Sequence, residues 1–452
     1  MLGGMPKRRT QPLGAQATDG DRLVGTYQAA ALSVAVIVSA IFYGLGALLA
    51  AAVVIPVIYG LARLRAHTPD ARNTAEMIGA TLGPRAATAA GIIQLCAYLA
   101  LAAAFSGGLG LQLLHLVSPN AAPAAVLAWL PAGAVAAAAV GGTTVCLAST
   151  RILASLVAIL ATTGLLIYLY LAVAVTTRIA SGSEPVVIGT AATPTHLSAQ
   201  VVAYGVAFVG VEIITANIGQ MAAPVRSMSL AITVVVAAAV TLWVADHTSV
   251  TGPWRWTAKH FGEAVPEFYA EAGQIWMAVA AATLGMAGVL AAGWGAVRIA
   301  TGLAITRGKN PCLRWRATVV AAIALIAAAI TAHVPRGHGI AAVTLSTAVL
   351  LLMTLYVLVS EANSRLPGDS VVAWWVRLAI PTLGLVAVLK PIADSHFAPL
   401  DVATVIAAAV VVSAAAITAA LLVPAAPTQP AVDHPGSSDD NQADPTRRSP
   451  AN

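Results

Sequence analysis

The sequence contains few charged residues, since Asp, Glu, Lys and Arg together make up only 9% of its 452 positions. Soluble globular domains carry about 25% charged residues, so this composition excludes an ordinary soluble protein. Instead, 59% of the residues are hydrophobic, and they form uninterrupted runs of roughly 20 residues, the length that an α-helix needs to cross a bilayer. Barrel strands span about ten residues and alternate polar with apolar positions, a pattern that these runs lack. The sequence therefore predicts an all-α polytopic membrane protein.

Cysteine is scarce as well, with Cys96, Cys146 and Cys312 as the three in the chain. Two fall in expected helices and one in an expected loop, so they indicate no disulfide framework. The sequence also lacks enzyme signatures: it has no glycine-rich phosphate loop ending in Lys-Ser or Lys-Thr and no histidine pair at helical spacing. The net charge of +6 is explained by basic loops at a membrane surface and requires no nucleic acid. We expect no enzymatic activity, no cofactor and no metal site.

The apolar runs predict about twelve transmembrane helices. Their expected ranges are 23–43, 46–64, 86–116, 123–148, 152–176, a sixth helix inside 197–233, then 229–250, 274–305, 317–333, 339–360, 371–390 and 400–424. A short interfacial helix is expected over 74–82. The aromatic-rich polar stretch 251–273 is expected to lie at the membrane interface.

The basic residues indicate the orientation of these helices. With twelve spans, 19 of the 24 Lys and Arg residues fall on the side that holds both termini. Cytoplasmic loops are enriched in Lys and Arg, so both termini are expected in the cytoplasm and the protein in the cytoplasmic membrane. The chain then divides into a cytoplasmic tail over 1–22, a transmembrane domain over 23–424 and a disordered cytoplasmic tail over 425–452.

The stretch 197–233 is the most informative part of the sequence. It is apolar, is interrupted by Gly205, Gly210 and Gly219, and carries Glu212 near its middle. An ionisable side chain at that depth costs about 2.5 to 3.5 kcal/mol on insertion scales, so it marks a site that faces protein or water. Glu212 has two interpretations: an acid that binds a proton or responds to a cationic substrate, or a structural carboxyl group hydrogen-bonded to a neighbouring helix.

Other interior residues also have a functional and a structural interpretation. Between Gly205 and Gly210 an unwound backbone could offer free N–H and C=O groups to a substrate carboxylate or ammonium. Alternatively, these glycines permit close packing of helices. Gln94, Tyr98 and Trp294 lie within expected helices, where they would either line a cavity or serve as ordinary packing residues.

The segment from Ala207 to Ile232 reads AFVGVEIITANIGQMAAPVRSMSLAI. It resembles helix 6 and the following loop of the amino acid/polyamine/organocation (APC) superfamily of permeases. That family has a Phe-x-Gly-x-Glu core and, after about ten residues, Asn-Pro-x-Arg-x-x-x-x-Ala-Ile. The positions that match are Phe208, Gly210, Glu212, Pro224, Arg226, Ala231 and Ile232. The stretches 81–85 and 295–298 agree as well, and the resemblance covers roughly residues 25–420.

The resemblance implies a fold of two inverted five-helix repeats plus two C-terminal helices, with substrate held between broken helices 1 and 6. Family members move amino acids or related amines by proton coupling or exchange. Carried onto this chain, Glu212 becomes a coupling or gating acid. The implied substrate-binding residues are Ser39, Ala40 and Ile41 in helix 1 and Ala207, Phe208 and Gly210 in helix 6.

Helix 1 departs from the family pattern, because the segment 32–42 contains no glycine and so unwinds less readily. Two hypotheses follow. The first is a permease that moves an amino acid or amine across the cytoplasmic membrane by alternating access. The second is a non-transporting membrane protein of the same fold that acts as a sensor or as a subunit of a larger assembly. The expected partners are the small-molecule substrate, the lipid bilayer and protons, and a homo-oligomer stays open.

Overall fold

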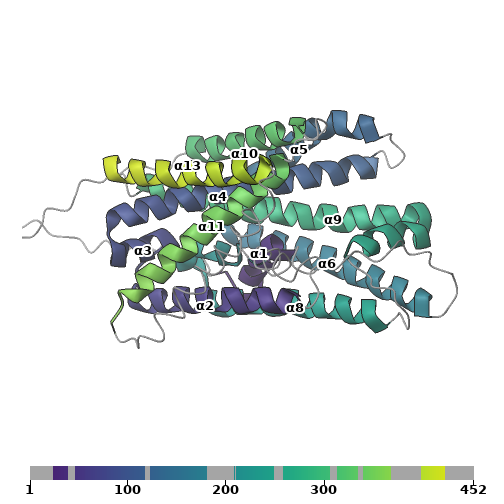
Figure 1. Ribbon diagram of the computed structural model, residues 1–452, viewed down its shortest axis with the longest axis horizontal. Coiled ribbons are helices and arrows are strands. Elements are labelled where there is room, and N and C mark those ends of the chain that lie inside the picture. The colour runs from purple at the N-terminus through teal and green to yellow at the C-terminus, as the bar shows by residue number, and fades with distance from the viewer. Residues whose placement is uncertain are drawn as a thin grey trace, which may run out of the picture.

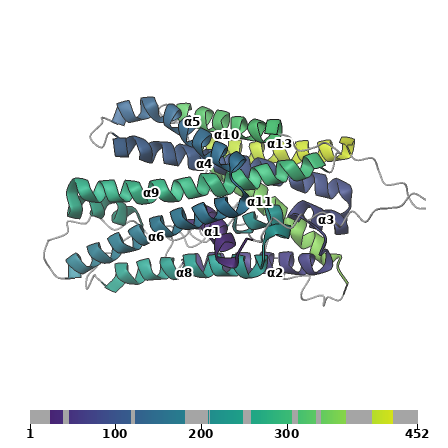
Figure 2. The same ribbon diagram turned by 180° about the vertical axis from the view of Figure 1, so that it is seen from behind.

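The structure is a computed structural model. It describes residues 24–38, 46–117, 123–180, 208, 210–248, 258–305, 313–333, 340–367 and 399–422. Seven helices in these ranges are long and apolar enough to cross a membrane. Most of the long helices run along one common direction (Figures 1 and 2).

The described chain is helical from end to end. The elements before the sixth predicted span are α1 (Thr26–Ile37), α2 (Gly46–His67), α3 (Thr74–Leu82), α4 (Pro84–Val117), α5 (Pro123–Leu147) and α6 (Thr150–Ala180). The elements after it are the 3₁₀ helix η2 (Val211–Gln220), α8 (Pro224–Thr248), α9 (Ala258–Ile305), α10 (Leu313–His333), α11 (Ile340–Ser364) and α13 (Pro399–Leu422). The predicted all-α polytopic fold is confirmed.

The bounds of most helices agree with the expected ranges to within about five residues, apart from α9. The expected helix 23–43 is described only to residue 38, and the described part of the sixth expected span is the 3₁₀ helix η2. Helix α9 begins at Ala258, whereas the apolar run predicted a start at 274. Residues 258–273 contain Ala, Glu and Lys, which favour helix formation but are too polar for a hydropathy pattern to include. The predicted span 371–390 lies outside the described residues, as do both predicted tails.

The helices are arranged around α4 and α9. Figures 1 and 2 show α5, α10 and α13 along one side of this pair, and α6, α8 and α2 along the other. The largest fully buried side chains include Tyr98 on α4, Trp294 on α9, Tyr356 on α11 and Phe208 just before η2. A membrane protein usually buries such large aromatic groups away from lipid only where several helices meet, so these side chains mark the centre of the bundle.

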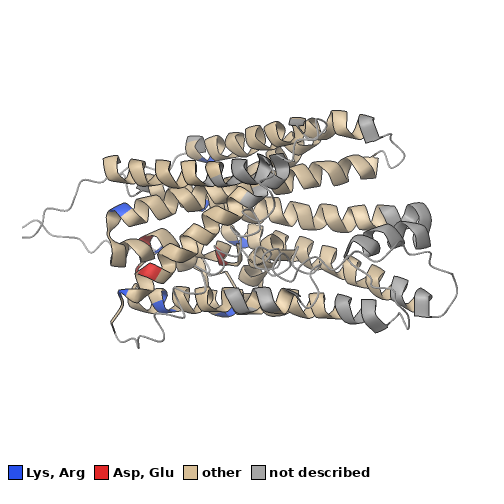
Figure 3. Cartoon of the chain, viewed as in Figure 1, with Lys and Arg blue, Asp and Glu red and all other residues tan. Residues whose placement is uncertain are grey.

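The described Lys, Arg, Asp and Glu residues lie in the half of the molecule that contains α3 (Figure 3). The five basic residues that the prediction places on the opposite face, Arg178, Arg255, Lys259, Arg336 and Lys390, are outside the described side chains. The orientation of the termini stays a prediction.

Candidate functional site

The centre of the site is Gly210, the N-cap residue of η2, where the span predicted over 197–233 departs from helical geometry; we call this point the interruption. This residue is buried and has a φ of +104°, which non-glycine residues rarely adopt. A Cβ atom at this position would also collide with the side chain of Val36 on α1. From Val211 the chain continues as a 3₁₀ helix, whose three residues per turn align every third side chain. The backbone conformation and the close approach of α1 both require glycine here.

Glu212 lies in the first turn of η2 with only 1% of its surface exposed. The hydroxyl group of Tyr98 donates a hydrogen bond to its Oε1 atom at 3.2 Å. The other carboxylate oxygen, Oε2, accepts a hydrogen bond from the hydroxyl group of Tyr356 and another from the backbone N–H of Gly210 at 3.1 Å. One carboxyl group therefore joins three elements: η2, α4 and α11.

Glu212, Gly210, Tyr98 and Tyr356 form one hydrogen-bonded group, the Glu212 cluster. The amide of Gln94 extends this cluster along α4. Its Nε2 atom donates to the hydroxyl oxygen of Tyr98 at 3.0 Å, while its Oε1 atom is buried and has no hydrogen-bond partner. The structure thus brings Gln94 and Tyr98, two of the residues predicted from the sequence, to Glu212. It also adds Tyr356, which the sequence analysis did not single out.

Three buried hydroxyl groups, from α1, α3 and η2 itself, support the backbone of η2 directly or through one another. On α1, Ser33 donates from Oγ to the carbonyl oxygen of Val211 at 2.7 Å. Within η2, Thr215 donates to the carbonyl oxygen of Glu212 at 2.7 Å. Thr74 at the start of α3 shares a hydrogen bond of 2.5 Å with the hydroxyl group of Thr215. These side chains are all buried, and they fix the backbone on either side of the carboxyl group.

The far end of η2 is bound through the backbone. The N–H of Val24 donates to the carbonyl oxygen of Gln220 at 2.9 Å, and the N–H of Ala222 donates to the carbonyl oxygen of Val24 at 3.1 Å. The N–H of Ile218 donates to the carbonyl oxygen of Arg72, in the turn before α3, at 2.9 Å. Val24, two residues before α1, and the turn before α3 therefore both hold η2 in place.

Trp294 is also buried, on α9, and its indole Nε1 atom has no hydrogen-bond partner. The next residue, Gly295, packs against the ring of Tyr98 and against Ile213 of η2 so closely that a Cβ atom there would lie 2.8 Å from the tyrosine ring. Trp294 is therefore next in sequence to a residue that contacts the Glu212 cluster, but its own side chain makes no hydrogen bond to it.

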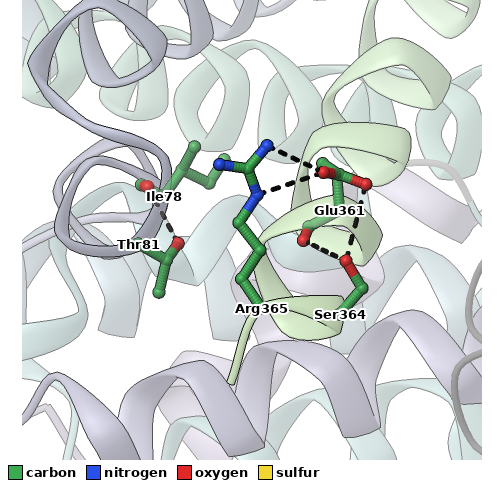
Figure 4. A network of polar contacts seen from close by, with 5 residues as sticks. All are labelled: Ile78, Thr81, Glu361, Ser364 and Arg365. Carbon is green, nitrogen blue, oxygen red and sulfur yellow. Dashed lines mark hydrogen bonds and ion pairs between the residues drawn. The ribbon is translucent and has the colours of Figure 1, made fainter. Parts of the chain in front are cut away.

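Glu361 on α11 is an exposed, ion-paired acidic residue and serves as a comparison for Glu212. Its carboxylate binds the Arg365 guanidinium at 3.1 and 3.2 Å, and the two side chains are 41% and 59% exposed. In Figure 4, Arg365 reaches from α11 toward the segment of α3 that holds Ile78 and Thr81. Glu212 differs, because no basic side chain of the described residues pairs with it.

The surroundings of Glu212 are compatible with a carboxyl group that changes between a charged and a neutralised state. Its three hydrogen-bond donors are neutral, and they stabilise an ionised carboxylate without cancelling its charge. A buried carboxylate without a cation is costly, so this group favours binding either a proton or a positively charged ligand. In the described ranges no three His, Cys, Asp or Glu side chains gather where they would hold a metal ion.

Of the other predicted substrate-binding residues, Phe208 is fully buried directly before the interruption, and its carbonyl oxygen accepts from the N–H of Val211 at 3.3 Å. Ser39, Ala40, Ile41 and Ala207 lie outside the described residues. Their predicted contact with substrate stays a prediction.

No family model matches the sequence, and no curated protein matches it. Solved structures do resemble it in fold. The manganese transporter of Eremococcus coleocola, in complex with an aromatic bis-isothiourea substituted compound, has a TM-score of 0.52 and 13% identity, covering 88% of this chain and 94% of its own. A point mutant of that transporter has a TM-score of 0.50 and 14% identity over the same shares. Mhp1, a nucleobase-cation-symport-1 family transporter in a closed conformation with bromovinylhydantoin bound, has a TM-score of 0.45 and 16% identity, covering 89% of this chain and 94% of its own.

At these identities the likeness concerns the fold alone. It extends over most of this chain and nearly all of the manganese transporter. The chain is therefore a multi-pass, all-α membrane protein whose fold resembles that of a membrane transporter.

Proposed function

We propose that this chain is a secondary active transporter of the cytoplasmic membrane, with both termini in the cytoplasm. It moves an amino acid or a related amine by alternating access, by proton coupling or by exchange. The observation that supports this proposal is Glu212, a buried carboxyl group in the first turn of η2, which begins directly after the non-helical Gly210, with no basic partner among the described residues. Secondary transporters bind substrate and coupling ions at such interrupted helices. The likeness in fold to a manganese transporter supports the same proposal.

Glu212 would serve as the coupling or gating acid, because its hydrogen-bond donors belong to elements that can separate. Tyr98 belongs to α4 and Tyr356 to α11, so a displacement of η2 from either helix removes a donor. Fewer hydrogen bonds then offset the charge of the carboxylate, and the gain from binding a proton or cation increases. Helix movement and ligand binding would therefore depend on each other, which is the condition for coupling.

The proposed substrate contacts lie around the interruption. Phe208 and Gly210 would contact substrate directly, together with Ala207 and, from helix 1, Ser39, Ala40 and Ile41. The proposed lining of the cavity is Gln94, Tyr98 and Trp294. The hydrogen bonds from Gln94 to Tyr98 and from Tyr98 to Glu212 support a common site for Gln94, Tyr98 and Glu212.

Uptake and counterflow in proteoliposomes test the proposal. Pooled labelled amino acids and amines are offered with and without an inward proton gradient, and Mn²⁺ is included because the structure similar in fold is a manganese transporter. We expect gradient-stimulated accumulation of at least one amino acid or amine. Glu212→Gln should abolish the response to the gradient, whereas Glu361→Gln, which removes an exposed carboxylate, should leave it intact.

Two outcomes would overturn the proposal. Accumulation of Mn²⁺ with no flux of any organic compound would assign a different substrate class. No flux of any compound from verified folded protein would favour a sensor or a subunit of a larger assembly, and a stoichiometric partner retained in mild detergent would then be sought.

A further inference from the structure

At the N-terminal end of η2 the protein supplies a carboxyl group of its own. The backbone N–H of Gly210, which caps this helix, donates to the Glu212 carboxylate at 3.1 Å. The N-terminus of a helix is where free N–H groups and the helix dipole favour a negative charge. The carboxylate of Glu212 therefore fills the position at the interrupted helix where the carboxylate of an amino acid would otherwise be stabilised.

The cluster retains hydrogen-bond acceptors but has used its strongest donors. An ionised carboxylate offers about four lone-pair sites, of which Tyr98, Tyr356 and Gly210 occupy three. Both tyrosine hydroxyl groups donate their hydrogen atoms to Glu212. On the side of Tyr98, the Oε1 atom of Gln94 is a second acceptor, fully buried and without a partner.

The balance of these groups fits a ligand that donates hydrogen bonds and is positively charged. A protonated amine has three N–H donors and one positive charge, and it would satisfy the remaining acceptors of Glu212 and Gln94. Trp294 offers one unpartnered N–H donor, which is neutral and does not offset a second carboxylate near Glu212. Two carboxylates in a low-dielectric site repel each other strongly.

We propose that this site takes a protonated organic amine that carries no carboxylate, so that Glu212 supplies the anionic group that an amino acid substrate would bring with it. The inference deepens the proposed function and rests on it for the location of the site. Within the proposed class of amino acids and related amines, the protein selects the amines. Gln94 is then a second hydrogen-bond acceptor for the ammonium group.

Matched pairs of ligands test this selectivity directly. The purified full chain in nanodiscs is titrated calorimetrically with lysine and cadaverine, arginine and agmatine, and phenylalanine and phenethylamine, and flux of each compound is measured separately in proteoliposomes. In at least one pair, the amine is expected to bind about ten-fold or more tightly than its parent amino acid, since the amine does not bring a second uncompensated carboxylate into the buried site. Equal or tighter binding of the amino acids, binding of Mn²⁺ alone, or no binding of any probe would overturn the inference.

Variants identify the acceptors. Glu212→Gln should weaken binding of the preferred amine by at least about 30-fold, because it removes the buried charge that pairs with the ammonium group. Gln94→Met keeps the volume but removes the acceptor, and a weakening of about ten-fold is expected from the loss of one hydrogen bond to a charged group. Glu361→Gln, on the exposed part of α11, should bind the amine as the wild-type protein does. Unchanged amine binding in both Glu212→Gln and Gln94→Met would contradict the assignment of the site.

The two measurements separate this inference from the proposed function. An amine that binds selectively but shows no flux supports the amine site and overturns transport. Flux of an amino acid that binds as tightly as its amine supports transport and overturns the amine site.

Discussion

The interrupted helix at Glu212 and the contact between α4 and α5 show two different ways to place backbone deep inside a membrane protein. At the α4–α5 contact, Gly110 faces the backbone of Gly133 and Ala134, and a Cβ atom at Gly110 would lie only 2.5 Å from the nitrogen of Ala134. Gly110 and Gly133 lie inside the continuous helices α4 and α5, where most backbone groups are hydrogen-bonded within the helix; Pro131 of α5 is an exception, because it has no N–H. Small residues allow such helices to approach until their backbones touch.

At the interruption, side chains form hydrogen bonds with backbone groups that a regular helix would bind through its own backbone. The N–H of Gly210 donates to the carboxylate of Glu212, and the carbonyl oxygen of Val211 accepts from Ser33. No water is present in the hydrocarbon region to satisfy backbone groups, so irregular backbone there must be bound by protein. The contact between α4 and α5 should therefore respond to changes in volume, and the interruption to changes in hydrogen bonding.

Glu212→Ala should produce the largest loss of stability. It leaves the hydroxyl groups of Tyr98 and Tyr356 without their acceptor, and each unsatisfied buried group costs about 1–3 kcal/mol. The N–H of Gly210 also loses the carboxylate and keeps only the hydroxyl oxygen of Tyr356 as an acceptor, at 3.2 Å. We expect a loss of about 3 kcal/mol or more in the free energy of unfolding, measured by thermal unfolding in detergent. The matched variant Glu361→Ala removes an exposed ion pair and should cost about 1 kcal/mol or less. Similar unfolding temperatures for the two variants would show that the buried hydrogen bonds add little.

Gly210→Ala comes next, because two costs add at one position. A residue with a side chain is strained by about 1–3 kcal/mol at a φ of +104°, and the new methyl group collides with Val36. We expect a loss of about 3 kcal/mol and lower yields of folded protein on size-exclusion chromatography. Gly219→Ala is the control, since this glycine is in the same 3₁₀ helix and has open space around it. The second substitution Val36→Ala should recover only part of the loss, and full recovery would mean that the backbone conformation is not strained.

The sequence predicted much of this fold because a membrane restricts what a chain can do. Apolar runs of sufficient length must form helices, so α4, α10 and α11 began and ended close to their expected ranges. Glycine and glutamate stand out within an apolar run, so the sequence alone points to Gly210 and Glu212. Their rarity at that depth is itself the signal.

The partners of Glu212 were harder to identify. Tyr356 lies 144 positions away in sequence, within an apolar helix where a tyrosine resembles any other buried aromatic residue. Ser33 and Thr74 are single hydroxyl groups, whose role depends on the elements that face them. Their hydrogen bonds arise from the packing of α1, α3 and α11 around η2, and no spacing along the chain specifies that packing.

Gly110→Ala tests the other side of the comparison. The added methyl group would meet backbone atoms of Gly133 and Ala134, which cannot rotate away as a side chain can, so α4 and α5 must separate. Overpacking of this kind costs about 1–3 kcal/mol, and we expect a loss of about 2 kcal/mol in detergent unfolding. Gly108→Ala, two residues earlier on an exposed part of α4, meets no atom within 4 Å and should be neutral or stabilising by up to about 1 kcal/mol. The comparison fails if both substitutions shift the unfolding temperature equally.

Ser33→Ala and Ser106→Ala compare a buried hydroxyl group at the interruption with one inside a regular helix, and their expected effects on stability are the smallest. Both hydroxyl groups are fully buried and donate to a carbonyl oxygen, at 2.7 Å for Ser33 and 2.8 Å for Ser106. Ser106 donates to Ala102 within its own helix, whereas Ser33 joins α1 to Val211 at the interruption. Ser33→Ala should therefore cost about 1 kcal/mol, while Ser106→Ala should change stability by only a few tenths of that amount, because alanine favours a helix more than serine does. Hydrogen exchange at the amides of 211–216 provides the sharper measurement: it should accelerate in Ser33→Ala alone, and equal exchange in the two variants would show that α1 does not hold the interrupted helix in place.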